Sequence, residues 1–179
     1  MIQCMDGKKF RDMFVSGANN LQNNKDLVDK YKDSDEYTEV LEGYLWYCQY
    51  NFSNEYLANK NIRKAISLAI DKDDLVNNVL KDGSIAAKGF VPTALATGPD
   101  GKDFRETSAN DYMTYDVEVA QEYWEKAKQE LGIETLTLEL LFEDTDSMKK
   151  CAEFIQSELQ TNLPGLTIEL KSQPKKNRL

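Results

Sequence analysis

The sequence contains no histidine, and this absence removes several kinds of active site at once. Ser-His and Cys-His nucleophile pairs and His-ligated zinc or iron sites all require an imidazole. The cysteines are few and far apart in the sequence: Cys4, Cys48 and Cys151. Because their number is odd and no two are close, they predict neither a disulfide framework nor a Cys-x-x-Cys site. We therefore expect no metal site and no cofactor, with the thiols packing as small apolar groups.

Positive charge and long apolar runs are also scarce. The 22 Lys and Arg residues are outnumbered by 31 Asp and Glu residues, which gives a net charge of -9. A surface this acidic repels phosphates, so we expect no nucleic-acid partner. No apolar run approaches the roughly 20 residues of a membrane span, and the N-terminal region lacks the pattern of a signal peptide, so we expect no leader in this chain. The 179 residues, 41% of them hydrophobic, are enough for a buried core.

The first third of the chain carries mixed secondary-structure signals. Short helical stretches are expected at residues 8–15 and 24–33, where apolar residues recur on one face. The run from Tyr44 to Tyr50 is rich in aromatic residues, and these fall on both faces of an extended chain. The run therefore predicts a strand buried on both faces. Residues 51–61 contain several Asn residues and predict a loop.

The middle of the chain predicts two consecutive helices followed by a long loop. Residues 62–70 place apolar side chains at the spacing of a helix packed on a core. Asp71 is expected to cap a second helix, whose apolar stripe extends to Leu80 and whose C′ residue is Gly83. Residues 84–115 predict a long loop, and loops of this length usually serve a binding site or wrap another element.

The last third predicts the fold class. Asp116 caps an amphipathic helix over residues 117–131, and residues 136–142, 147–162 and 166–171 read as strand, helix and strand. Such a unit implies two parallel strands joined by a right-handed crossover, so the fold class is α/β. Ligands of open α/β sheets bind beyond the carboxyl ends of the strands, which here is the turn at residues 143–146.

That turn allows more than one interpretation. Glu143, Asp144 and Asp146 offer carboxylates for a calcium or magnesium ion, or for acid and base catalysis. The alternative, which we favour, is helix capping by Thr145 or Asp146, with the acidic residues stabilised by the helix dipole.

Two further stretches are candidates for ligand contact. Tyr47 and Gln49 share one face of the predicted strand and carry polar tips. The loop at residues 88–92 places Phe90 and Val91 beside a glycine, and this loop either lines a groove or seals the helix pair.

The stretch Asn61 to Val76, NIRKAISLAIDKDDLV, resembles the signature of the oligopeptide-binding proteins of bacterial ABC importers, solute-binding protein family 5. The resemblance continues through the Gly-Phe-Val-Pro loop at residues 89–92 and the strand at 140–142, and it covers about residues 25–179. Within this family the sequence resembles the lipoproteins of Gram-positive bacteria, including the peptide-pheromone binders.

The resemblance implies an incomplete lobe of the type II periplasmic-binding-protein fold. Residues 1–52 would be the tail of lobe one with its crossing strand, and residues 53–179 the first part of lobe two. The implied function is capture of oligopeptides for an ABC permease, without catalysis. The parent protein would be lipid-anchored on the extracellular face of the membrane, or periplasmic in a Gram-negative organism.

The resemblance also implies peptide contacts near Tyr47, Leu80, Lys81 and Met148. Family members can carry a basic or imidazole group at the position of Met148, so recognition of a peptide carboxylate there is not expected of this chain. Together with the residue-based candidates, the expected peptide-binding set is Tyr47, Gln49, Leu80, Lys81, Phe90, Val91, Asp144 and Met148.

Two alternatives to peptide capture remain open from the sequence. The first is a receptor for another small solute, such as a sugar or a metal chelate, on the same scaffold. The second is a hydrolase that uses carboxylates such as Asp144 and Asp146. Exposed sheet edges would in addition allow the chain to associate with itself.

Overall fold

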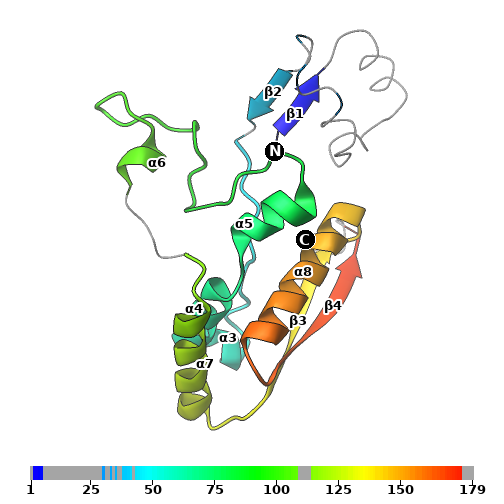
Figure 1. Ribbon diagram of the computed structural model, residues 1–179. Helices are drawn as coiled ribbons and strands as arrows, with labels where there is room; N and C mark the ends of the chain where they lie inside the picture. Colours follow the sequence, from blue (N-terminus) through cyan, green and yellow to red (C-terminus); the bar gives the residue numbers. More distant parts are fainter. Residues whose placement is uncertain are drawn as a thin grey trace. The chain divides into compact units, whose positions relative to one another are not determined.

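The computed structural model divides the chain into two compact units, and the chain runs from one unit to the other more than once (Figure 1). The first unit comprises Met1–Leu45 and Val76–Ala109, and the second comprises Trp46–Leu75 and Asn110–Leu179. The structure describes residues 2–5, 30, 33, 35, 38–41, 43–108 and 114–174. The helix predicted at residues 8–15, and nearly all of the one at 24–33, lie outside the described residues.

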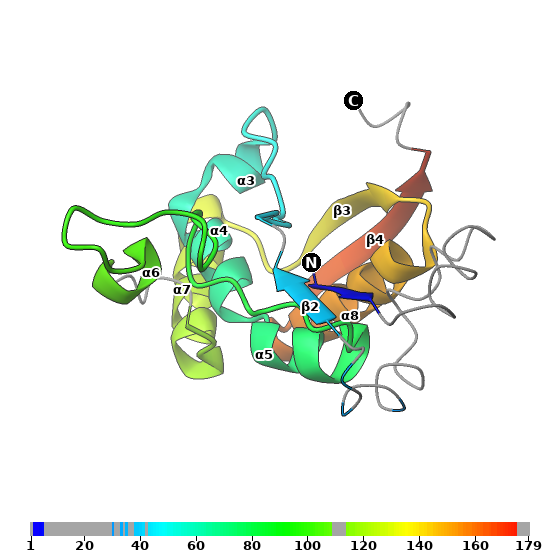
Figure 2. The same ribbon diagram turned by 90° about the horizontal axis from the view of Figure 1, so that it is seen from above.

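The second unit is built around a parallel strand pair, as the sequence predicts. Strand β3, Leu136–Glu143, pairs with β4, Leu166–Gln173, in a register that runs from Leu136 opposite Leu166 to Glu143 opposite Gln173. Helix α8, Asp146–Asn162, connects the two strands and runs alongside both of them (Figure 2). The α/β prediction and the β-α-β unit are therefore confirmed.

The side chains of β3 and β4 alternate between a buried and an exposed face. Leu136, Leu138, Leu166 and Ile168 are buried, whereas the intervening residues are mostly exposed. On the exposed face Glu139 lies opposite Glu169, and Lys171 forms an ion pair with Glu139. This alternation leaves one face polar and directs the other to the core.

Two helices complete the core of this unit. Helix α4, Lys60–Leu68, packs against α7, Val117–Leu131, and these helices contribute Ala65 and Ala127, both fully buried, to the core. Trp124 is also fully buried, and its indole nitrogen donates a hydrogen bond of 2.8 Å to the carbonyl oxygen of Pro164. These helices confirm the periodicity read from the sequence at residues 62–70 and 117–131.

Helix boundaries in this unit are determined by local capping. Asp116 caps α7 by accepting a hydrogen bond from the Val119 amide, and Gly132 follows the helix with a φ of 65°, a left-handed conformation that favours glycine. Asp71 caps α5, Lys72–Asp74, through the Asp74 amide. These predicted caps are confirmed.

The loop prediction for residues 51–61 is wrong in part. A short helix, α3, spans Glu55–Ala58, and Asn54 caps it. Asn59 then caps α4 by accepting from the amides of Asn61 and Ile62. Asn residues favour turns, but the same side chain also satisfies the free amides of a helix start.

The prediction of a doubly buried strand at residues 44–50 is also wrong. No regular strand forms there in the described part of the chain, and Tyr44, Trp46 and Tyr47 are 66%, 56% and 64% exposed. Only Tyr50 is drawn toward the core, where its hydroxyl lies 3.1 Å from the Ser67 hydroxyl. A run of aromatic residues favours a strand only when a partner strand and covering side chains are available, and local sequence does not encode them.

Among its described residues, the first unit contains an antiparallel strand pair, most of one helical turn that enters from the second unit, and a short helix. Strand β1, Ile2–Met5, pairs with β2, Thr38–Leu41. A π-helical turn, η2, Leu75–Leu80, continues from α5, and a short helix α6, Phe104–Thr107, lies within the predicted long loop.

The end of η2 differs from the prediction. The expected C′ residue was Gly83, but Lys81 already adopts a left-handed φ of 52° directly after the helix. Its amide donates to the carbonyl oxygen of Val76 at 3.0 Å, which closes the wide π-type turn. Gly83 does have a positive φ of 80°, but it lies beyond the helix end.

Candidate functional site

The predicted site residues are divided between the two units. Leu80, Lys81, Phe90 and Val91 belong to the first unit, and Tyr47, Gln49, Asp144 and Met148 belong to the second.

In the first unit, Leu80 and Lys81 lie at the end of η2. Leu80 is half-buried, whereas Lys81 is exposed and holds its left-handed conformation without being a glycine. A non-glycine residue in this conformation costs free energy, which the surrounding turn has to offset. The turn therefore fixes the direction in which the chain leaves η2 at the position where the peptide contacts were predicted.

The loop at residues 88–92 presents its apolar residues unequally. Phe90 is 79% exposed, whereas Val91 and Pro92 are half-buried. Behind the loop, the guanidinium group of Arg105 lies directly against Gly89. Phe90 therefore does not serve as a seal for the core. Its neighbour Gly89 lies against a charged side chain that sequence reasoning missed.

Asp103 organises the segment that carries Arg105. One carboxylate oxygen of Asp103 accepts a hydrogen bond of 2.7 Å from the Arg105 amide and so caps α6, while the other accepts from the Ala94 amide. The Phe104 amide donates to the carbonyl oxygen of Ala96 at 2.8 Å, which brings the two ends of the intervening turn together. The sequence signal for this turn is Asp103, a residue type that favours helix starts. One such residue within a long loop does not suffice to predict a helix.

In the second unit, Tyr47 and Gln49 lie within the largely exposed segment at residues 44–50. Both side chains are exposed, as is the neighbouring Trp46. Phe52 follows this segment in the sequence, and the guanidinium of Arg63, in α4, lies 4.6 Å from the centroid of its ring. This segment thus presents aromatic surface to the solvent rather than to the core.

Asp144 and Met148 are brought together at the carboxyl end of β3. The Asp144 amide donates to the carbonyl oxygen of Gln173 at 3.1 Å, and the Met148 amide donates to the hydroxyl of Thr145 at 3.3 Å. Thr145 is therefore the N-cap of α8, which confirms the capping interpretation of this turn. In the described part of the chain, no three acidic or cysteine side chains converge as they would to hold a metal ion.

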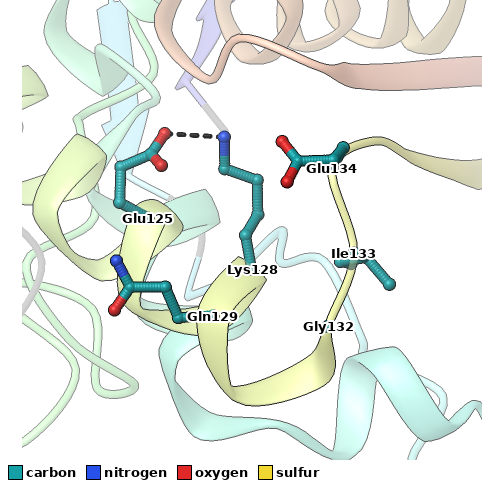
Figure 3. Close-up of a pocket in the computed structure, with 6 residues that line it drawn as sticks. All are labelled: Glu125, Lys128, Gln129, Gly132, Ile133 and Glu134. Carbon is teal, nitrogen blue, oxygen red and sulfur yellow. Dashed lines mark ion pairs between the residues drawn. The ribbon is translucent and has the colours of Figure 1, made fainter.

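A surface hollow lies at the other end of β3. It has a volume of about 360 Å³ and is lined by the end of α7 and the residues that lead into β3 (Figure 3). Figure 3 shows the Lys128 ammonium between Glu125, with which it forms an ion pair of 2.7 Å, and the side chain of Glu134. The hollow is polar and includes none of the predicted residues. Its lining comes from the exposed face of an amphipathic helix, where sequence carries no signal for a site.

Comparison with known proteins gives consistent results. Residues 10–179 match the family model described as bacterial extracellular solute-binding proteins, family 5 Middle. A dipeptide-binding protein of Lactococcus lactis is 36% identical over 164 residues, a match that covers 86% of this chain and 30% of that protein. The oligopeptide-binding protein OppA of Bacillus subtilis is 30% identical over 143 residues, covering 78% of this chain and 25% of that protein.

Solved structures agree with the sequence comparison. Listeria monocytogenes OppA bound to peptide has a TM-score of 0.78 and 39% identity, covering 86% of this chain and 31% of that one. The pheromone receptor PrgZ has a TM-score of 0.74 and 38% identity, covering 84% of this chain and 30% of that one. The chain therefore spans about 30% of the length of the dipeptide-binding protein it matches.

Proposed function

Because the chain belongs to family 5 of the bacterial extracellular solute-binding proteins, we propose that it takes part in capturing oligopeptides for import by an ABC transporter. Its fold is part of a type II periplasmic-binding-protein-like α/β lobe. The observation that carries the proposal is the similarity to Listeria monocytogenes OppA bound to peptide, at 39% identity and a TM-score of 0.78 over 86% of the chain. The names of the curated relatives, dipeptide-binding and oligopeptide-binding proteins, support a peptide as the ligand.

The proposal includes a division of the chain between two lobes. Residues 1–52 would form the last part of lobe one, and residues 53–179 would form the first part of lobe two. The match covers 30% of the Lactococcus lactis protein, so the proposed division concerns only this part of such a receptor. The permease is the proposed membrane partner, because the chain belongs to a family of extracellular solute-binding proteins. None of the described helices has the length and apolar character of a membrane span.

The proposed peptide contacts are the residues expected from the sequence: Tyr47, Gln49, Leu80, Lys81, Phe90, Val91, Asp144 and Met148. For two of them, Tyr47 and Phe90, the exposure of 64% and 79% supports this role. Large aromatic side chains in contact with solvent provide apolar area that a peptide side chain can bury.

Family members are binding proteins, and we extend this to propose that the chain performs no catalysis and needs no cofactor. Solute-binding proteins of this family act outside the cytoplasm. We propose a lipid-anchored location at the extracellular face of the membrane, or a periplasmic one in a Gram-negative organism.

The test is retention of a peptide library by the polypeptide that carries this chain in the cell. The protein is incubated with random peptides of several lengths and with a mixture of sugars and metal chelates, then washed, denatured and analysed by mass spectrometry. We expect intact peptides to be retained. Retention of sugars or chelates alone would favour the second type of receptor, and cleaved peptides would favour a hydrolase.

Residues 1–179 by themselves should bind peptides only weakly, because in the proposed division they supply only part of each lobe and so an incomplete clamp. Trp46, which is 56% exposed, offers a fluorescence reporter, and the fully buried Trp124 provides an internal reference. Micromolar or tighter binding by this segment alone would contradict the two-lobe division.

A further inference from the structure

We infer that Arg105 is the positioning residue of the loop at residues 88–92: its guanidinium holds the backbone at Gly89 and so fixes the place where Phe90 meets a peptide. This inference rests on the proposed function, since it assigns a role in peptide binding. It adds a residue that neither the sequence analysis nor the family resemblance indicated.

The contact between Arg105 and Gly89 is too close for any side chain at position 89. A Cβ atom built on Gly89 would lie 1.8 Å from Nη1 of Arg105, 3.0 Å from Cζ and 3.5 Å from Nη2. The guanidinium group therefore occupies the space of the missing side chain. Gly89 does not have a positive φ, so the contact rather than the backbone conformation requires glycine here.

Arg105 is held in this place from several sides. Its Nη2 donates to the carbonyl oxygen of Ser108 at 3.2 Å, and its backbone amide is bound by Asp103 at 2.7 Å. The guanidinium carbon lies 5.3 Å from the ring centroid of Phe104. These contacts anchor both ends of the side chain within the turn that Asp103 organises.

One feature of Arg105 is costly for a purely structural side chain. Its Nε is buried, and no hydrogen-bond partner reaches it from the described residues. A buried donor without a partner lowers stability, and such groups in folded proteins need a compensating reason. Support of the loop backbone at Gly89 is that reason in the proposed arrangement.

The supported loop carries the most exposed of the large hydrophobic side chains in the described structure, Phe90, at 79%. Pro92 restricts the loop further, because its ring fixes its own φ and limits the conformations of Val91. An aromatic side chain that is exposed on a restrained backbone loses little conformational entropy when a ligand covers it. Arg105 therefore contributes to affinity without touching the peptide.

The experiment compares retention of a random pentapeptide library by the intact polypeptide with that by four variants: Gly89→Ala, Arg105→Ala, Arg105→Lys and the double variant Gly89→Ala/Arg105→Ala. We expect each single variant to lose affinity about tenfold, because the bound conformation of the loop is no longer preorganised. Arg105→Lys should not restore peptide binding, since the Lys ammonium lacks the planar guanidinium group that lies on Gly89. Lys102→Ala, which removes an exposed cation from the same turn, serves as the matched control and should retain peptides like the parent.

The double variant tests the contact itself. Without the Arg105 side chain there is room for a Cβ at position 89, so Gly89→Ala should cost less than about threefold in that background. An equal cost in both backgrounds would overturn the inference. So would single variants that retain peptides as the parent does, or full rescue by Lys.

A spectroscopic measurement separates positioning from general destabilisation. Fluorophenylalanine at position 90 should give a ¹⁹F signal that narrows toward that of a mobile side chain in Arg105→Ala, while circular dichroism and the unfolding midpoint stay close to those of Lys102→Ala. An unchanged ¹⁹F signal would overturn the inference even if peptide binding fell. If the parent polypeptide retains no peptide at all, the proposed function fails, and the inference fails with it.

Discussion

The side-chain amide of Asn162 donates a hydrogen bond of 2.9 Å to the carbonyl oxygen of Ala69, which joins the last residue of α8 to the residue that follows α4. Both residues are buried, and 93 positions separate them in the sequence. The Asn162 carbonyl in turn accepts from Gln121 of α7 at 3.0 Å. One side chain and its backbone thus connect three helices of the second unit.

Replacing Asn162 with Ala should lower the free energy of unfolding by about 1–3 kcal/mol, because the buried carbonyl of Ala69 loses its partner. Urea unfolding followed by circular dichroism measures the change. Ser157→Ala, at an exposed position of the same helix, is the control and should stay within about 0.5 kcal/mol of the parent. Equal stability of the two variants would show that the hydrogen bond contributes nothing.

Asp116→Ala should destabilise α7 by about 0.5–2 kcal/mol, since the Val119 amide loses its capping acceptor at 3.0 Å. Asp116→Asn should keep most of the stability, because an amide oxygen caps as well. The unfolding midpoints of these variants are compared with that of Glu118→Ala, which removes a first-turn acid that is not the cap. If Asp116→Asn lost as much stability as Asp116→Ala, capping would be contradicted as the cause.

Glu130 predicts a specific pH dependence. Its Oε2 accepts hydrogen bonds from the side-chain amides of Asn59 at 3.0 Å and Asn61 at 2.8 Å, and these hydrogen bonds lower its pKa below the ordinary value. A carboxyl group with a depressed pKa stabilises the fold above its unfolded-state pKa and loses this contribution as the pH falls through the folded-state pKa. Below about pH 4.5, the free energy of unfolding of Glu130→Gln should therefore fall less steeply with decreasing pH than that of the parent.

The measurement is a series of unfolding curves between neutral and acidic pH for the parent and Glu130→Gln. The Gln oxygen can still accept a hydrogen bond, so the variant keeps the geometry and removes only the titration. Glu122→Gln, on the same helix, controls for the change in net charge. Parallel pH profiles of the parent and Glu130→Gln would refute the assignment.

The outer edge of β4 is closed by two side chains of α8. Gln156 donates to the carbonyl oxygen of Ile168 at 2.7 Å, and Gln160 accepts from the Ile168 amide at 3.0 Å. Open strand edges recruit other strands, so these side chains protect the sheet at this point. Replacing both Gln156 and Gln160 with Ala should raise the tendency of the chain to self-associate.

Sedimentation velocity over a range of concentrations measures this effect. We expect the double variant to form larger species at concentrations where the parent and the Ser157→Ala control remain unchanged. A variant that sediments like the parent would indicate that the edge is protected by something other than these amides.

The site could be anticipated only in part, for a physical reason that particular residues illustrate. The sequence predicts Asp116 as a cap and Thr145 as one of two candidates, because a cap and the amide it binds are three residues apart in the sequence. Arg105 was missed because its partner, Gly89, precedes the turn that Asp103 organises, and no periodicity connects them. The roles proposed for Tyr47 and Phe90 in peptide binding stay predictions.

The sequence by itself determined the features that depend on neighbours along the chain. The spacing of apolar residues predicted α4, α7, α8 and the parallel strands, and local acceptors predicted the helix starts, because hydrogen bonds within a turn and burial of one helix face are encoded within a few residues. Only the tertiary structure decided what covers each surface. It left the aromatic segment at residues 44–50 largely exposed, joined Asn162 to Ala69 across 93 positions, and placed Arg105 against Gly89, since contacts between distant segments depend on how the whole chain packs.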